Sequence, residues 1–178
     1  MTLLVVTIVV ALAFDFTNGF HDTANYVATW VGTRALSPRA AVLVSAAANL
    51  AGAFVTTAVA KTVGKGIIDS GLANPRTVLA AVLGAIVWNL LTWWLGLPSS
   101  STHALIGGLV GAALVQSGSK GVAWHGIIHK VAIPALAAPV IAGLSAFVLL
   151  LAIFWGLQKL TPAVAGRSFR FGQLFSGT

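Results

Sequence analysis

The sequence contains no cysteine and no glutamate, and aspartate occurs at only three of its 178 positions. Without cysteine, the chain has no disulfide bonds, no thiol catalysis and no cysteine metal sites. Charged residues of either sign make up only 7% of the chain, against about 25% in an average soluble domain. A composition this poor in charge excludes an ordinary soluble globular fold.

Apolar residues fill the chain instead, at 58% of all positions and a mean hydropathy of +0.96. A membrane-spanning helix needs about 20 mostly apolar residues, so we predict an all-α polytopic membrane protein. The expected spans are residues 2–34, 38–60, 77–96 and 139–158. Residues 61–76 form a loop, because they combine glycine, Asn-Pro and three basic residues.

The ten basic residues give a net charge of +7, but they are scattered between the hydrophobic segments. This is the pattern of loops and membrane ends. A nucleic-acid partner would need a basic face or stripe, so the sequence indicates lipid as the partner and not nucleic acid. The tail after residue 160 is basic and irregular, and the charge rule places it in the cytoplasm.

The segment "FDFTNGFHDTAN", residues 14–25, places two of the three acidic residues inside an apolar span. Positions i, i+4, i+7 and i+11 share one helix face, which defines a polar stripe of Asn18, Asp22, Asn25 and Thr29. We expect residues 2–34 to form one helix that is either broken or polar-striped. A carboxylate beside amide oxygens offers hard ligands for Na⁺, or Asp22 can carry a proton. The alternative is hydrogen bonding between helices.

The segment "PSSSTH", residues 98–103, follows the third predicted span. Four hydroxyls precede a new helix: Ser99, Ser100, Ser101 and Thr102. Free N–H groups and the helix dipole favour an anion at such a start, although an N-cap needs only one of the four. The apolar part that follows is short for a crossing, so we predict a re-entrant helix or half-hairpin with a glycine seam for close packing.

The histidines leave fewer clear roles. His103 is expected either to donate to the same anion or to bond a neighbouring helix. His21 adjoins Asp22 but projects about 100° away on a helix, which favours a packed or backbone-bonded ring. His125 and His129 have metal-pair spacing without a third ligand. Neither "GxSxG" nor a P-loop is present, so no catalytic residue is expected and the chain is not predicted to be an enzyme.

These motifs together resemble the inorganic phosphate transporter family, the PiT or PHO4 group. "NGFHDTAN" (18–25), followed by "VGTRALSP" (31–38), is similar to the family signature GANDxAN. "LPSSSTHALIGGLVGAAL" (97–114) resembles the family's Ser/Thr-rich hairpin. "AKTVGKGIID" (60–69) and "GAIVWNLLTWWLGLP" (84–98) match as well.

The resemblance implies secondary active transport of inorganic phosphate across the plasma membrane, coupled to H⁺ or Na⁺. It implies two inverted repeats, each with a broken motif helix and a Ser/Thr-rich re-entrant hairpin. Asp22 and Asn25 would then serve both phosphate and the coupling ion, with Asn18 nearby and Ser99 to Thr102 as the phosphate cradle. No other cofactor or metal is implied. Some sodium-coupled members carry Glu where this chain has Asn49, which counts against sodium.

The resemblance covers nearly the whole chain but only the first half of a typical member. Residues 1–160 would be the first transmembrane repeat, and residues 161–178 resemble the central cytoplasmic linker. We therefore expect either a second repeat in a longer protein or the pairing of two half-size chains as a homodimer. Sulfate or a metal–phosphate complex remains an alternative substrate, and a non-transporting membrane scaffold subunit remains an alternative function.

Overall fold

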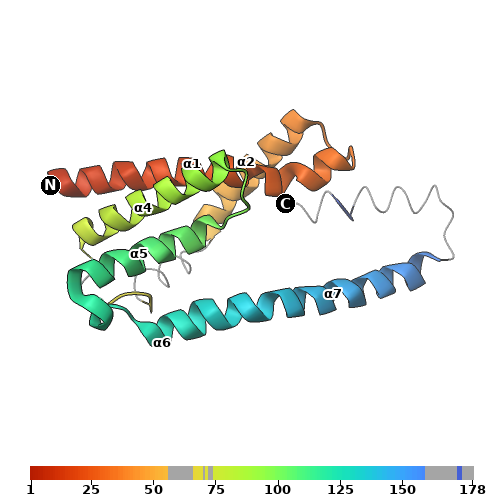
Figure 1. Cartoon of the computed structure of the whole chain (residues 1–178). Helices are drawn as coiled ribbons and strands as arrows, with labels where there is room; N and C mark the ends of the chain where they lie inside the picture. Colours follow the sequence, from red (N-terminus) through yellow and green to blue (C-terminus); the bar gives the residue numbers. More distant parts are fainter. Residues whose placement is uncertain (56–65, 70, 72–73, 159–171, 174–178) are drawn as a thin grey trace. The chain divides into compact units, whose positions relative to one another are not determined.

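A computed structural model of the chain describes residues 1–55, 66–69, 71, 74–158 and 172–173 (Figure 1). The longer helices are α1 (Thr2–Gly32), α2 (Pro38–Val55), α4 (Pro75–Trp94), α5 (Ser101–Ser117) and α7 (Ile133–Leu157). Between α5 and α7 lie a 3₁₀ turn (Gly118–Gly121), the short α6 (Trp124–Ile127) and a π turn (Ile128–Ala132). The described residues otherwise contain one isolated bridge, Ile68 with Val122, and no strand. The all-α prediction is confirmed.

Among the described residues, three helical stretches are long and apolar enough to cross a membrane: Thr2–Gly32, Pro75–Trp94 and Trp124–Gly156. A fourth apolar helix, Pro38–Phe54, is shorter. The end of the predicted second span, residues 56–60, lies outside the described residues. Length and composition therefore support the multi-pass prediction over the part of the chain that the structure describes.

The chain divides into two compact units, and the first combines Met1–Ala24 with Thr56–Ile128. In this unit α4 and α5 form an antiparallel helical hairpin. At its base Thr77 Oγ1 donates to Gln116 Oε1 at 2.6 Å, and near its tip Trp88 Nε1 donates to Ser99 Oγ at 3.0 Å. The predicted Ser/Thr-rich segment, residues 98–118, is a single helix, α5, which pairs with the helix of the third predicted span, α4. The re-entry of this segment into a membrane stays a prediction.

The sequence ends one helix of this hairpin and starts the next within a few residues. The backbone N–H groups of Gly96 and Leu97 bond the carbonyls of Trp93 and Thr92 at 3.1 and 2.8 Å. This is the Schellman arrangement, which needs a left-handed residue, and Gly96 supplies it at φ +65°. Ser100 then caps α5 through the N–H of His103 at 3.4 Å.

A small core joins α1 to this hairpin. Phe14 of α1 is buried with Val82 and Ala85 of α4, and Ala104 and Leu105 of α5 pack against them. The two hairpin helices approach closely at Gly108, where a Cβ would collide with the backbone of Ala81. The glycine seam predicted from the sequence therefore has one position at which glycine is required.

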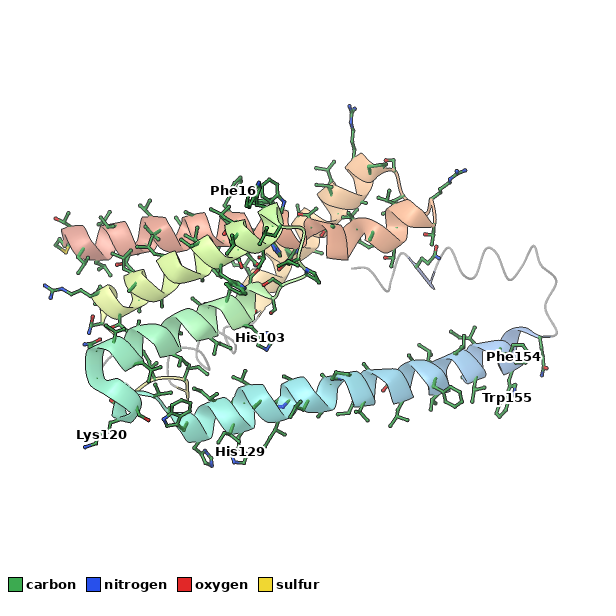
Figure 2. All side chains as sticks on the ribbon, viewed as in Figure 1. Phe16, His103, Lys120, His129, Phe154 and Trp155 are labelled. Atoms are coloured by element: carbon green, nitrogen blue, oxygen red, sulfur yellow. The ribbon has the colours of Figure 1, made fainter. Side chains whose placement is uncertain are left out.

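The second unit combines Asn25–Val55 with His129–Thr178. Trp30 is fully buried in it, and its Nε1 donates to the carbonyl of Gln173 at 2.6 Å. The α7 helix keeps most of its apolar side chains exposed, and Phe154 and Trp155 project from its last turns (Figure 2). Apart from residues 172–173, the predicted tail 161–178 lies outside the described residues, so its assignment as a linker stays a prediction.

The expected break in the motif helix is absent, because α1 runs as one helix from Thr2 to Gly32. Of the two alternatives, the structure has the polar-striped helix. Its hydroxyl side chains explain why no break is needed: Thr17 Oγ1 donates to the carbonyl of Phe14 at 2.8 Å, and Thr23 Oγ1 donates to that of Gly19. Such bonds satisfy polar groups inside the helix itself.

Predicted boundaries also move, and two of the shifts have a visible cause. The third helix begins at Pro75 and not at residue 77, because Asn74 caps it by accepting from the N–H groups of Arg76 and Thr77. The last long helix begins at Ile133 and not at residue 139, with Pro139 inside it. Proline is tolerated within membrane helices, so it did not mark a boundary here.

The close approach at Gly108 gives a matched pair of variants. Gly108→Ala is expected to destabilise the protein by about 1–3 kcal/mol, because the methyl group would overpack the α4–α5 contact. Gly111→Ala, one turn later with open space around its Cα, should gain up to about 1 kcal/mol in helix propensity. Thermal unfolding of the purified protein in detergent checks the pair. Equal melting temperatures for the two variants would contradict the close approach.

Candidate functional site

Asp22 brings together the two polar motifs of the sequence. Ser101, the first residue of α5, donates from Oγ to Asp22 Oδ2 at 3.2 Å. Ser101 is 3% exposed and lies 79 positions further along the chain. The Asn/Asp motif and the Ser/Thr motif, both predicted as functional, thus meet inside the first unit.

His21 and Thr92 extend this contact. His21 Nδ1 lies 2.8 Å from Asp22 Oδ1, and His21 Nε2 lies 3.5 Å from Thr92 Oγ1. The side chains of His21 and Asp22 are 8% and 18% exposed. We name His21, Asp22, Thr92 and Ser101 the Asp22 cluster. It draws one or two residues from each of α1, α4 and α5.

The His21 ring is packed, as expected, with its side chain 8% exposed. It also contacts the neighbouring Asp22 carboxylate, which the sequence analysis did not expect. The angle of about 100° between adjacent positions is bridged by side-chain torsions. Thr92 was also missed. Its signal was a polar residue inside an apolar span, which in a membrane protein marks a functional or inward-facing position.

The other hydroxyls of "PSSSTH" take separate partners. Ser99 Oγ accepts from Trp88 Nε1, and Ser100 Oγ lies 2.9 Å from His103 Nδ1. Ser99, Ser100 and His103 line a cavity of about 590 Å³ beside α4, and Figure 2 shows His103 projecting from the first turn of α5. Thr102 is exposed. His103 therefore bonds its own helix cap, which neither of its two expected roles had named.

For the remaining residues of the predicted stripe, the structure gives no side-chain hydrogen bond with the Asp22 cluster among the described residues. Asn18 is half-buried in α1 one turn before Asp22. The Asn25 side chain lies outside the part of the chain that the structure describes. Thr29 belongs to the second unit, where it is exposed and its carbonyl accepts from Thr33 Oγ1 at 2.6 Å. Of the stripe residues whose side chains the structure describes, Asp22 is the one with a hydrogen bond to α5.

The surroundings of Asp22 can stabilise its negative charge, and its oxygens can also bind a cation. The carboxylate lies at the start of α5, where the helix dipole and free N–H groups stabilise negative charge. Its oxygens and the Ser101 hydroxyl are hard donors of the kind that bind alkali and alkaline-earth cations. Among the described residues no three His, Cys, Asp or Glu gather around one point, so any cation here would rely on hydroxyl and amide oxygens as well.

Asn89 is a buried residue that the sequence analysis did not single out. It is 1% exposed, and neither Oδ1 nor Nδ2 has a hydrogen-bond partner among the described residues. Its backbone carbonyl lies 3.1 Å from Thr92 Oγ1, which places it one turn before the Asp22 cluster on the buried face of α4. An unpaired buried amide costs about 1–3 kcal/mol, so this position is not optimised for stability.

Comparison with known proteins assigns these motifs to one family. The model of the "Phosphate transporter family" matches residues 18–173. Proteins named probable low-affinity inorganic phosphate transporter are 51% identical in Mycobacterium bovis and in Streptomyces halstedii. Each match covers 99% of this chain. The matched region makes up 42% of the Mycobacterium protein and 83% of the Streptomyces protein. A Bacillus subtilis protein of the same name is 47% identical over 151 residues.

A solved structure described as the sodium-dependent phosphate transporter has a similar fold. It superposes with a TM-score of 0.84 at 30% sequence identity. The match covers 93% of this chain and 42% of the other. The chain therefore spans less than half of that structure and of the Mycobacterium relative.

The buried amide of Asn89 makes a prediction about stability. Asn89→Leu keeps the branched shape and removes two unpaired polar atoms, so it is expected to raise the free energy of unfolding by about 1 kcal/mol or more. Thr77→Val is the control, because Thr77 is equally buried but bonds Gln116; this variant should lose about 1 kcal/mol. Thermal unfolding in detergent measures both. A less stable Asn89→Leu variant would show that the amide has a partner.

Proposed function

This chain belongs to the phosphate transporter family, and we propose that it takes part in moving inorganic phosphate across the plasma membrane, coupled to the flow of H⁺ or Na⁺. The reaction is transport and not chemistry on the substrate, in keeping with relatives that are named as transporters. In the part of the chain that the structure describes, three apolar helices of spanning length support the membrane setting.

The hydrogen bond between Asp22 and Ser101 is the observation that carries this proposal. It joins a carboxylate, which can hold a cation or a proton, to the start of a helix, which can hold an anion. A symporter needs both kinds of site close together. We propose that phosphate binds at the start of α5 through Ser99, Ser100, Ser101 and Thr102, with Asp22 and Asn25 beside it.

Electrostatics give a reason for the coupling. The Ser101 hydroxyl at the start of α5 donates to the Asp22 carboxylate, so the carboxylate lies where we propose that phosphate binds. Two like charges within about 4–6 Å repel strongly in a medium of low dielectric constant, so a phosphate anion is disfavoured beside the bare carboxylate. A proton or Na⁺ on Asp22 removes this repulsion. We propose Asp22, Asn25, Asn18 and Thr29 as the coupling-ion residues, with Na⁺ held at Asp22 and Asn25 if sodium is the ion.

A longer relative supports the proposal that further chain completes the site at Asp22. The similar sodium-dependent structure is more than twice as long as the matched region, and inverted repeats that meet at a midplane site are common in secondary transporters. We propose that residues 1–160 act as one repeat, with 161–178 as a linker, and that a second repeat or a second copy of the chain completes the site.

Asp22 should be required for uptake. Asp22→Asn, in the complete gene product that contains this chain, is expected to reduce phosphate uptake at least tenfold. The amide has no negative charge to attract a cation, and it does not take up a proton as a carboxylate does. Asp15→Asn is the matched control, since Asp15 is an exposed residue of the same helix and should keep wild-type uptake. Labelled phosphate uptake into cells measures both. Normal uptake by Asp22→Asn would remove Asp22 from the coupling site.

Phosphate should be preferred over sulfate. At neutral pH phosphate keeps at least one P–OH group, which can donate to the hydroxyl and amide oxygens of the proposed site, whereas sulfate offers acceptors alone. A tenfold excess of sulfate is therefore expected to leave phosphate uptake nearly unchanged. Strong competition by sulfate would favour a general oxyanion carrier, and loss of uptake on removing divalent metal would favour a metal–phosphate complex.

A further inference from the structure

The Asp22 carboxylate is held from two sides. Its Oδ1 faces His21 Nδ1 at 2.8 Å, and its Oδ2 accepts from Ser101 Oγ at 3.2 Å. One contact comes from α1 and the other from α5, so together they fix both the plane and the direction of the carboxylate. An ionised carboxyl group has about four lone-pair sites, and this arrangement leaves two of them for a ligand.

The far side of the His21 ring is backed by α4. Thr92 Oγ1 lies 3.5 Å from His21 Nε2, at the outer limit of a hydrogen bond. Thr92 is 3% exposed, and its hydroxyl also lies 2.9 Å from the carbonyl of Trp88 and 3.1 Å from that of Asn89. A buried hydroxyl with these backbone contacts is well fixed in position, so the ring meets a defined polar group.

The Thr92 hydroxyl has one proton, and it donates that proton to the backbone carbonyls of its own helix, at 2.9 Å to Trp88 and 3.1 Å to Asn89. Its oxygen therefore faces His21 Nε2 as an acceptor, at 3.5 Å. On the other side of the ring, the 2.8 Å between His21 Nδ1 and Asp22 Oδ1 requires one proton between them. Thr92 and Asp22 thus meet the two nitrogens of one ring and together define its orientation.

Aromatic packing holds α1 and α4 in register at the same level. Phe20, next to His21, meets Trp93, next to Thr92, edge to face with ring centroids 5.4 Å apart. Such pairs contribute beyond their buried area. The polar contact between His21 and Thr92 therefore lies beside an apolar one that fixes the distance between the two helices.

We propose that His21 and Thr92 are positioning residues, which hold the Asp22 carboxylate turned toward Ser101 so that the substrate and its coupling ion meet it in a fixed orientation. The inference rests on the proposed phosphate transport and adds two residues to it. Without His21, the carboxylate keeps the Ser101 contact but can rotate about it. The expected effect is weaker substrate binding and not a loss of the protein.

Two substitutions of His21 test which of its two ring nitrogens matters for binding. Asn places an amide nitrogen near the position of Nδ1, and Gln reaches with one near the position of Nε2. His21→Gln is expected to raise the KM for phosphate uptake roughly tenfold, the typical value of a charge-assisted hydrogen bond. His21→Asn should keep KM within about threefold of wild type. KM does not depend on the amount of transporter at the cell surface, so reduced expression does not obscure the result.

Thr92 provides a second test. Thr92→Val is expected to raise the KM for phosphate about threefold, whereas Thr92→Ser, which keeps the hydroxyl, should have the wild-type KM. In the His21→Asn background Thr92→Val should have no further effect, because the Asn side chain is too short to reach Thr92. Positioning is supported if His21→Gln has a higher KM than His21→Asn. It is overturned if the two variants share one KM, if their order is reversed, or if Thr92→Val acts equally in both backgrounds.

The same experiment distinguishes this inference from the proposed function. Wild-type cells that take up no phosphate would overturn transport and positioning together. Normal wild-type uptake with equal KM values for the two His21 variants would overturn positioning alone. A phosphate-induced rise in the melting temperature of the purified protein gives an independent measure of binding, which His21→Gln should lose and His21→Asn should keep.

Discussion

A carboxylate inside an apolar helical protein has to be paired, and the first unit is arranged around the way Asp22 meets this requirement. Lipid offers no hydrogen bonds, so the partners come from the protein: His21 on the same helix and Ser101 from the start of α5. These two bonds explain why a polar motif near the N-terminus and a hydroxyl-rich motif near residue 100 lie together.

The hairpin of α4 and α5 gives Ser101 its place. It is closed at its base by Thr77 and Gln116, drawn together at Gly108, and turned by the left-handed Gly96. Each of these features depends on a particular residue type, since close approach and positive φ both favour glycine. The site is therefore carried by a scaffold that the local sequence specifies strongly.

Much of the fold could be predicted from the sequence, because the composition and the helical spacing of polar residues indicate which side chains are buried. The all-helical fold followed from low charge and apolar length. Asp22 and Ser101, which the two polar motifs had singled out as candidates, are in contact in the structure. The partners of His21 could not be predicted, because periodicity gives the direction of the backbone position and not the side-chain torsions. Thr92 and Asn89 were missed because a single polar residue in a span carries no spacing pattern.

The hairpin has three ties, at Gln116, Gly108 and Ser99, which join α4 to α5 at the base, along the middle and near the tip. Ser101 connects that tip to Asp22 of α1. Because the two helices are tied at three levels, we expect α4 and α5 to move as one body. A change at the contact between Asp22 and Ser101 would then act on both helices together.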